Sequence, residues 1–509
     1  MKQVFSRLND KFDLGALIAL ALMLCALSVS RLIYPFDLGH FEACVWTPSL
    51  MSAQGHNPYG FALREPFVMA PYGYFYYLIV GLGVRLFGWQ LWFGRALTVV
   101  SAVVCVVWIA KIAWALTRDR RAAMLAVIFF LSTNVLFHWV GVHRPDLLAM
   151  AFSFAALALV FTSRDEPDRI GWRVLMVIAL LVSAFFFKQT ALLPIAVAIA
   201  RYLQLGKMRL AMTILAGVAL ICSIIALALN ATSDGGYFWQ HLTLMKQTPQ
   251  NYDWALKWFI AIFKSPSTWI GLAVVYGAIV SRFGWAPFRI ASLTRERLIS
   301  LLQSPGALLL AYFVVAFTFA FVTSSRVGAY INYYLEALIV LAIIVALSWK
   351  QLSAGRLGGK SRYLYTAAVC LFALGAEIEF WRLYHAESFR YRSEAYYREI
   401  VETLAREVPP QSTIISVHPE LATASGHNYH FGDFLQYGDG RSEQLREVIQ
   451  REISSGRYRA VVWVQADSPM MKGYRLVPMK QSAHEKYYPV YLYLRDDSQT
   501  SRGQSPPDR

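Results

Sequence analysis

Two carboxylates stand directly after the first long apolar run of the chain, in the stretch YPFDLGHFEACVW at residues 34–46. Asp37 and Glu42 are five residues apart with Gly39 between them, so a turn could bring both side chains to one site. Such a pair could provide a general base for a hydroxyl or hold a divalent metal ion. The same spacing fits a helix N-cap followed by a solvated loop acid. The pair by itself therefore leaves the chemistry open.

A third acid occurs in the stretch VHRPD at residues 142–146. Asp146 follows Pro145 at the start of an apolar run, which is ordinary chemistry for the first turn of a helix. In a functional interpretation, Asp146 is a further active-site acid, and Arg144 or His143 contacts a phosphate. The motif alone does not decide between the two interpretations.

A lysine, Lys188, falls in the stretch FFFKQTALLP, in a tight turn between two apolar segments. Its side chain could simply extend toward lipid headgroups. The segment before it is short for a membrane span, however, which would draw the turn into the edge of the bilayer. A compact positive charge at that depth suits a lipid phosphate.

The stretch SSRVGAYINYYLEA places Arg326, Asn332 and Glu336 at the start of a late apolar run. Its tyrosines are typical of the aromatic belt at a membrane surface. Glu336 lies about one turn inside the run, where an ionisable group needs a partner and tends to mark a substrate path. Arg326 is a candidate partner.

Several classes of site have no support in the sequence. We find no glycine-rich phosphate loop, no G-x-S-x-G motif and no nucleotide-binding βαβ fingerprint. Four of the five cysteines fall inside apolar runs and only Cys44 falls in a loop, so neither a disulfide framework nor a zinc site is indicated. No cofactor is predicted beyond a possible divalent metal ion at Asp37 and Glu42.

The elements that must position these residues are membrane helices. The chain is 57% hydrophobic and 16% charged, and apolar segments of spanning length recur as far as residue 381. This pattern predicts a polytopic helical membrane protein. We expect about eleven spans, at residues 14–33, 93–116, 122–138, 147–162, 174–187, 189–203, 210–229, 266–281, 306–323, 331–349 and 363–381.

The orientation follows from lysine and arginine. If residues 72–87 form an interfacial helix that does not span, the loops on the side of the N-terminus carry 20 Lys and Arg against 8 on the other side. Cytoplasmic loops carry the excess, so the N-terminus is predicted to be cytoplasmic. All candidate site residues then lie on the outer side. The net charge of +16 thus reflects topology and does not indicate nucleic acid.

The composition changes after residue 381. Residues 382–509 carry 17 Lys and Arg against 16 Asp and Glu. Short β-rich runs (TIISV, YRAVVWV, YPVYLYL) flank a helical stretch at residues 442–455. We expect a transmembrane domain at residues 1–381, a small extracytoplasmic α/β domain at 382–497 and a disordered tail at 498–509.

In order, the stretches FDLGHFE, GHNPYG, PYGYFYYLIVGLGVRLFG, GRAL, RPDLLAMAF, FFKQTALLPIA and GAYINYYLEA resemble the GT-C glycosyltransferases. The similarity is to bacterial enzymes related to the protein O-mannosyltransferases and the lipid A aminoarabinose transferase. It covers most of residues 30–350, and the tail is similar to the outer domain of the same group.

This resemblance implies a polyprenyl-phosphate sugar donor and an active site between the first outer loop and the membrane. It assigns Asp37 as the base, Glu42 as a second acid, Asp146 as the acid of the second outer loop and Lys188 as a phosphate contact. The first loop reads DLGHFE here, whereas the O-mannosyltransferases commonly have adjacent Asp and Glu. The division of roles between Asp37 and Glu42 therefore stays open.

The sequence thus predicts an inner-membrane enzyme that transfers a hexose or pentose, with inversion, to a hydroxyl of an envelope glycan, lipid or protein. One alternative is a ligase or polymerase that uses a lipid-linked oligosaccharide. Another is a transporter or flippase of lipid-linked sugars, although the internal repeats common in transporters are not evident.

Overall fold

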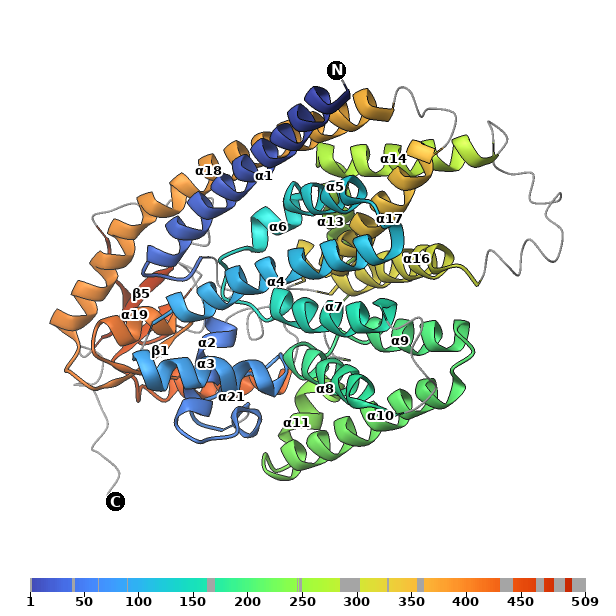
Figure 1. The fold of residues 1–509 in the computed structure, drawn as a ribbon. Helices are drawn as coiled ribbons and strands as arrows, with labels where there is room; N and C mark the ends of the chain where they lie inside the picture. Colours follow the sequence, from blue (N-terminus) through green and yellow to red (C-terminus); the bar gives the residue numbers. More distant parts are fainter. Residues whose placement is uncertain are drawn as a thin grey trace.

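A computed structural model describes residues 2–38, 42–62, 64–88, 90–162, 170–244, 246, 250–283, 303–326, 329–354, 361–430, 443–463, 471–479 and 490–496. Most of these residues are helical, and Figure 1 shows the helices packed side by side with a small sheet at one end. The first half of the chain contains α1 (Lys2–Ile33), α2 (Ala43–Ala53), α3 (Tyr74–Phe87), α4 (Trp92–Thr117), α5 (Arg120–Leu131), α6 (Asn134–Trp139), α7 (Asp146–Thr162), α8 (Trp172–Phe187), α9 (Leu193–Gln204) and α10 (Met208–Ala231). The second half contains α11 (Gly236–Phe238), a π-helix at Trp239–Leu244, α13 (Tyr252–Phe263), α14 (Pro266–Phe283), α16 (Pro305–Ser324), α17 (Leu335–Ala354) and α18 (Ser361–Glu407).

The helix α17 forms the centre of the bundle. It packs against α4, α5, α14 and α16, and nearly all of its side chains are buried. A helix that is apolar on every side can be stable only where neighbours cover all of its faces. The similarly apolar α7 packs between α4 and α8. Both helices begin at residues that the sequence marks as functional, Asp146 and the Asn332–Glu336 region, so the core positions the site.

Six described helices are long and apolar enough to cross a membrane, or seven if α13 and α14, which meet at a bend of 73°, form one span. Four shorter apolar helices, α3, α7, α8 and α9, accompany them. The predicted fold class, a polytopic helical membrane protein, is thereby confirmed, whereas the number eleven is not established. The expected span at 122–138 is divided into α5 and α6 by Ser132 and Thr133.

The segment predicted to lie along the membrane surface is helical as α3, and it packs against α2 in the first loop. Its depth in the bilayer stays a prediction, and so do the sides of the membrane on which the loops lie.

The C-terminal part contains the expected sheet. Its five strands are β1 (Thr413–Ser416), β2 (Asn428–His430), β3 (Ala460–Trp463), β4 (Tyr474–Leu476) and β5 (Tyr491–Arg495), in the order β2-β1-β3-β5-β4. The strand β1 runs parallel to β2 and β3, and β5 runs antiparallel to β3 and β4. Helices α19 (Pro419–Ala424) and α21 (Glu443–Ser454) complete this α/β unit. The three predicted strand runs and the predicted helix are all present, and the proposed disordered tail at 498–509 lies outside the described residues.

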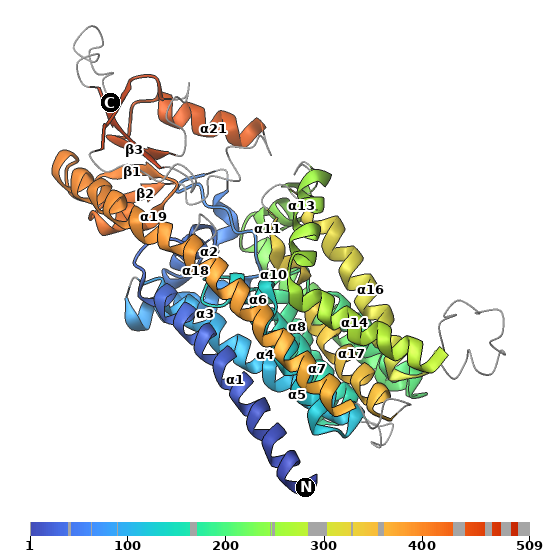
Figure 2. The same ribbon diagram turned by 90° about the horizontal axis from the view of Figure 1, so that it is seen from above.

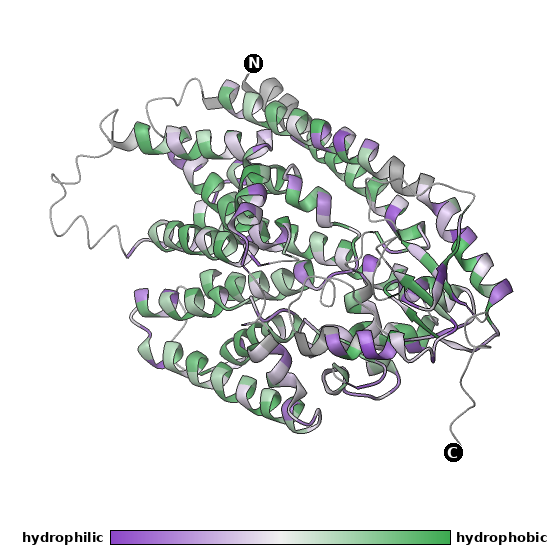
Figure 3. Cartoon of the chain, turned by 180° about the vertical axis from the view of Figure 1, so that it is seen from behind, coloured by the Kyte–Doolittle hydropathy of each residue, from purple (hydrophilic) through white to green (hydrophobic). Residues whose placement is uncertain are grey.

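One helix joins the two parts of the molecule. Figure 2 shows α18 running beside α1 along the bundle and continuing to the sheet. It crosses residue 381 without a break, although the hydropathy of the chain changes there. In Figure 3 the bundle is mainly hydrophobic, and hydrophilic segments gather toward the end that carries the sheet.

The orientation of the bundle can be tested with reporters. We expect a reporter fused after Arg120 to show a cytoplasmic location and one fused after Ser388 to show an external location, because the positive-inside asymmetry places these positions on opposite sides. Enzymatic reporters active in only one compartment make the measurement. An external location for Arg120 would mean that α3 spans the membrane and that the site faces the cytoplasm.

Candidate functional site

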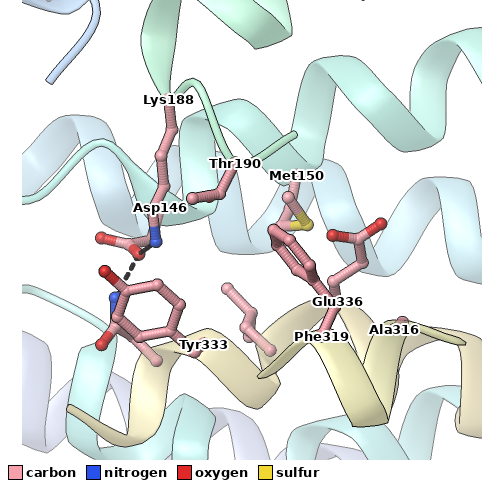
Figure 4. A pocket seen from close by; sticks show the side chains of 10 residues that line it. Asp146, Met150, Lys188, Thr190, Ala316, Phe319, Tyr333 and Glu336 are labelled. Atoms are coloured by element: carbon pink, nitrogen blue, oxygen red, sulfur yellow. Dashed lines mark hydrogen bonds and ion pairs between the residues drawn. The ribbon is translucent and has the colours of Figure 1, made fainter. Parts of the chain in front are cut away.

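Asp146 is the point at which residues from three distant segments meet. Lys188 Nζ forms an ion pair with Asp146 Oδ1, and Asn332 Nδ2 donates a hydrogen bond to the same oxygen at 2.5 Å. Arg144 Nε lies 3.9 Å from Asp146 Oδ2. Figure 4 shows Lys188 reaching down to Asp146 from the turn after α8. A carboxylate between two cations leaves one positive charge in excess, so the cluster is suited to bind an anion.

These residues line a pocket between α7, α8, α16 and α17 that contains about 370 Å³ of empty space, open solvent included. Its lining residues are Asp146, Met150, Lys188, Thr190, Ala316, Phe319, Asn332, Tyr333, Leu335 and Glu336. The Lys188 ammonium lies 4.6 Å from the centre of the Tyr333 ring. In Figure 4, Glu336 lies beyond Met150 and Phe319 from the Lys188–Asp146 pair. The pocket therefore has the Lys188–Asp146 ion pair at one end and the Glu336 carboxyl at the other, with apolar side chains between them.

The position of Lys188 depends on a close contact between backbones. Gly73 lies against the last turn of α8, where an added Cβ atom would come within 2.0 Å of the Phe186 carbonyl oxygen. The Gly73 N–H also donates to the Phe187 carbonyl oxygen at 3.3 Å. Only glycine permits this approach. The loop before α3 thus fixes the turn that carries Lys188.

Arg144 links the pocket to the first loop. Its Nη1 donates to Cys44 Sγ at 3.2 Å, its Nη2 donates to the Tyr72 hydroxyl, and its guanidinium lies 4.6 Å from the centre of the Tyr72 ring. Cys44 stands two residues after Glu42. The predicted acids of the first loop are therefore close in the fold to the cluster around Asp146.

Asp37 and Glu42 lie close together, as the sequence suggested. The Glu42 backbone N–H donates to Asp37 Oδ2 at 3.2 Å, and the Leu38 N–H donates to Glu42 Oε2 at 3.0 Å. Both carboxylates are buried. The two acids thus share one turn but have different surroundings.

Glu42 forms a buried ion pair with Arg95, a residue of α4. Arg95 Nε lies 2.9 Å from Glu42 Oε1, and Arg95 Nη2 lies 2.5 Å from Oε2. The same guanidinium donates to the carbonyl oxygens of Arg31 and Phe36. Burial acts to raise the pKa of the Glu42 carboxyl, but Arg95 outweighs this effect and holds the pKa below its ordinary value. Glu42 therefore stays ionised and fixes the turn.

The backbone of His143 contacts this ion pair, since its N–H donates a hydrogen bond to Glu42 Oε1 at 2.7 Å. Its ring is buried near Trp46 and Tyr76, and neither ring nitrogen has a hydrogen-bond partner among the described residues. Burial lowers the pKa of the imidazole to about 4, so the ring is neutral near pH 7. A phosphate contact from this side chain stays a prediction.

The divalent metal ion also stays a prediction. Both Glu42 oxygens accept hydrogen bonds, so coordination would require Glu42 to exchange these partners for the ion. Within the described part of the chain, no group of three His, Cys, Asp or Glu side chains is arranged to hold a metal.

Two other predicted residues have distinct surroundings. Glu336 Oε1 accepts a hydrogen bond from the Tyr312 hydroxyl at 2.6 Å, whereas the sequence suggested Arg326 as its partner. Arg326 lies just after the end of α16, where it forms an isolated β-bridge with Gln250. The structure thus groups Asp146, Lys188, Asn332 and Glu336 in one pocket with Arg144 adjacent, and Asp37 with Glu42 in the neighbouring turn.

Three residues of the candidate site, Arg95, Tyr72 and Tyr333, were not predicted from the sequence. Arg95 carried a usable signal, since an arginine inside a long apolar run needs a buried partner. Tyr72 and Tyr333 resemble ordinary aromatic-belt residues in sequence, and only the fold shows that they contact Arg144 and Lys188.

No model of a known protein family matches the chain, and no curated protein matches it. Solved structures do. A crystal structure of ArnT from Cupriavidus metallidurans bound to undecaprenyl phosphate is 14% identical, with a TM-score of 0.63, over 94% of this chain and 98% of that one. The same protein in the apo state is 15% identical with a TM-score of 0.61, over 95% and 99%. The chain therefore has the fold of these ArnT structures over nearly its whole length, which confirms the predicted fold class.

Proposed function

We propose that this chain with a GT-C fold is a bacterial inner-membrane glycosyltransferase that moves a sugar from a polyprenyl-phosphate donor to a hydroxyl of an envelope glycan, lipid or protein. The proposal is carried by one observation: the side chains of Lys188 and Arg144 both lie beside Asp146. Two cations and one carboxylate give this cluster a net positive charge, and it lies close to the buried segment that holds Asp37. That an ArnT structure of the same fold is bound to undecaprenyl phosphate supports this class of donor.

Lys188 and Arg144 stabilise the leaving group, the lipid phosphate. When the anomeric carbon separates from the phosphate oxygen, the bonding electrons stay on the lipid phosphate, and its negative charge grows. Fixed cations that meet this charge stabilise the transition state more than the ground state. Lys188 and Arg144 are held by Asp146 and Tyr72, so they need little reorganisation. Asp146 acts mainly to position them, since an acid between two cations is a weak base.

Asp37 activates the acceptor hydroxyl as a general base. Its carboxylate takes the proton of the acceptor hydroxyl as the oxygen attacks the anomeric carbon, and the bond to the lipid phosphate breaks on the opposite face of the sugar. One displacement inverts the configuration. The sugar arrives activated, so a soluble nucleotide site is not needed. Glu42 is less suited to this role, because Arg95 lowers its pKa, which makes it a weaker base, and occupies both of its carboxylate oxygens.

The Lys188→Gln variant is expected to bind undecaprenyl phosphate about 10- to 100-fold more weakly than the wild type. A hydrogen bond to a charged group contributes about 1.5–3 kcal/mol, which corresponds to this range of Kd. Glutamine keeps a polar side chain that is one atom shorter than lysine, and Arg144 remains beside Asp146 as a counter-ion, so the protein should still fold. The measurement is binding of undecaprenyl phosphate to the purified protein in lipid nanodiscs.

The matched control is Lys257→Gln, because Lys257 is an exposed lysine of α13 that contacts the rings of Trp254 and Trp258. The control should bind like the wild type. Equal affinity of Lys188→Gln and Lys257→Gln would show that Lys188 only anchors the turn.

The transferase itself is tested by mass spectrometry of envelope glycolipids and glycans from a deletion strain. A missing sugar mass that returns with the wild-type gene supports transfer and identifies the sugar. Loss of a whole oligosaccharide would indicate the ligase alternative. Accumulation of the lipid-linked sugar on the cytoplasmic leaflet would indicate a flippase.

A further inference from the structure

The C-terminal unit reaches the turn that carries Asp37. Phe36 and Leu38, on either side of Asp37, are buried in one hydrophobic cluster with Ile414 of β1 and Leu421 of α19. The ring of Tyr397 from α18 lies 5.4 Å from Phe36 and 6.0 Å from the His418 imidazole. The first loop is therefore built into the core of the C-terminal unit.

Within this contact, two polar residues of the C-terminal unit face the turn. Glu420 Oε1 lies 2.7 Å from His418 Nδ1 and 3.4 Å from the Asp37 backbone nitrogen, which donates to it. His418 is held in turn by Ser416, whose hydroxyl donates to the His418 carbonyl oxygen at 2.7 Å and accepts from its N–H at 3.2 Å. Both His418 and Glu420 are buried.

A buried carboxylate is a costly way to pack two parts of a protein together. An apolar side chain would fill the same space without the loss of hydration that an ionised acid suffers. The hydrophobic cluster already holds the two parts together, so stabilising their contact does not explain why His418 and Glu420 are buried there. Glu420 instead orients the backbone, because its oxygen accepts a hydrogen bond from the N–H of Asp37, the residue assigned as the base.

Three backbone N–H groups, those of Asp37, Leu38 and Glu42, are consequently held by carboxylates. The Asp37 N–H donates to Glu420, the Leu38 N–H donates to Glu42, and the Glu42 N–H donates to the Asp37 side chain. Arg95 fixes Glu42 from the membrane domain, and His418 fixes Glu420 from the C-terminal unit. We propose that Glu420, oriented by His418, is a positioning residue that sets the backbone of the Asp37 turn for catalysis. This inference rests on the proposed transferase function.

The test compares Glu420→Ala with Glu420→Gln in full-length protein. Alanine removes the acceptor for the Asp37 N–H, and we expect transfer to fall about 10- to 100-fold, because a small misplacement of a catalytic group can cost this much. Glutamine keeps a carbonyl oxygen at the same place and should restore most of the transfer. Transfer is measured as the amount of the missing sugar mass that each variant returns to the deletion strain.

Three further measurements separate positioning from folding. Undecaprenyl phosphate affinity and the thermal unfolding temperature of Glu420→Ala should stay close to those of the wild type. The amide of Asp37 should exchange hydrogen faster in Glu420→Ala than in Glu420→Gln. His418→Asn, which leaves Glu420 in place without its imidazole partner, should lose transfer to a smaller extent and serves if Glu420→Ala does not fold.

The control is Arg457→Ala, which breaks the exposed ion pair between Arg457 and Glu65 that also joins the C-terminal unit to the first loop. Exposed pairs contribute little, so this variant should be fully active. Equal transfer by Glu420→Ala and Arg457→Ala would overturn the inference, and so would a joint loss of affinity and unfolding temperature in both Glu420→Ala and His418→Asn. Wild-type protein that binds no undecaprenyl phosphate and returns no sugar mass would instead refute the proposed function, and the positioning role with it.

Discussion

The Asp37→Asn variant is expected to lose transfer by about 100- to 10,000-fold, the usual contribution of general-base catalysis, while it still folds and binds undecaprenyl phosphate. Asparagine keeps an oxygen that can accept from the Glu42 N–H, so the turn should persist. It cannot take a proton from the acceptor hydroxyl. Transfer is measured by return of the missing sugar mass, and donor-lipid binding is measured in nanodiscs.

The matched control for this variant is Asp253→Asn. Asp253 is an exposed acid in the first turn of α13, and its replacement makes the same chemical change away from the pocket. The control should transfer like the wild type. Near-normal turnover by Asp37→Asn would contradict the assignment, and the base would then be sought at Glu42 or Asp146.

The sequence was sufficient to predict most of the long helices, because each has a local pattern, whereas α2 and α13 lie in segments that were expected to be loops. The run at 93–116 became α4 at Trp92–Thr117, and the β-rich run TIISV became β1. The break between α5 and α6 was not predicted. Ser132 and Thr133 interrupt the helix only because the backbone groups left unpaired at the break find hydrogen-bond partners elsewhere in the fold, and the sequence does not show these partners. The Ser132 carbonyl oxygen accepts a hydrogen bond from the Ser267 hydroxyl of α14 at 2.9 Å.

The sequence indicated which residues belong to the candidate site but not which of them form ion pairs or hydrogen bonds with one another. Lys188 and Asp146 are 42 positions apart, and Glu42 and Arg95 are 53 apart. Charge patterns in one sequence show that a buried ion needs a partner and do not show which one. Glu336 illustrates the limit, because its partner Tyr312 is neutral and gave no electrostatic signal. His418 and Glu420 were hidden for a related reason, since nothing local connects them to Asp37.

The Arg95→Met variant is expected to destabilise the protein by about 3–5 kcal/mol, the usual cost of removing one partner of a buried ion pair. Methionine has a similar volume, so the loss would come from the uncompensated Glu42 carboxylate and from the carbonyl oxygens of Arg31 and Phe36. Unfolding is measured in mixed micelles by titration with a denaturing detergent. The control, Arg398→Met, breaks the exposed Arg398–Glu394 pair on α18 and should cost less than about 1 kcal/mol.

A double variant shows whether charge or shape holds the first loop. Glu42→Gln leaves Arg95 buried without its counter-ion, so it should also be destabilised. In Glu42→Gln with Arg95→Met, neither buried charge remains, and the cost should be clearly smaller than the sum of the two single changes. Additive costs would mean that Arg95 acts chiefly through the backbone carbonyl oxygens. If both single variants unfold like the wild type, the Glu42–Arg95 pair does not hold the turn, and Glu42 becomes available as a base or metal ligand.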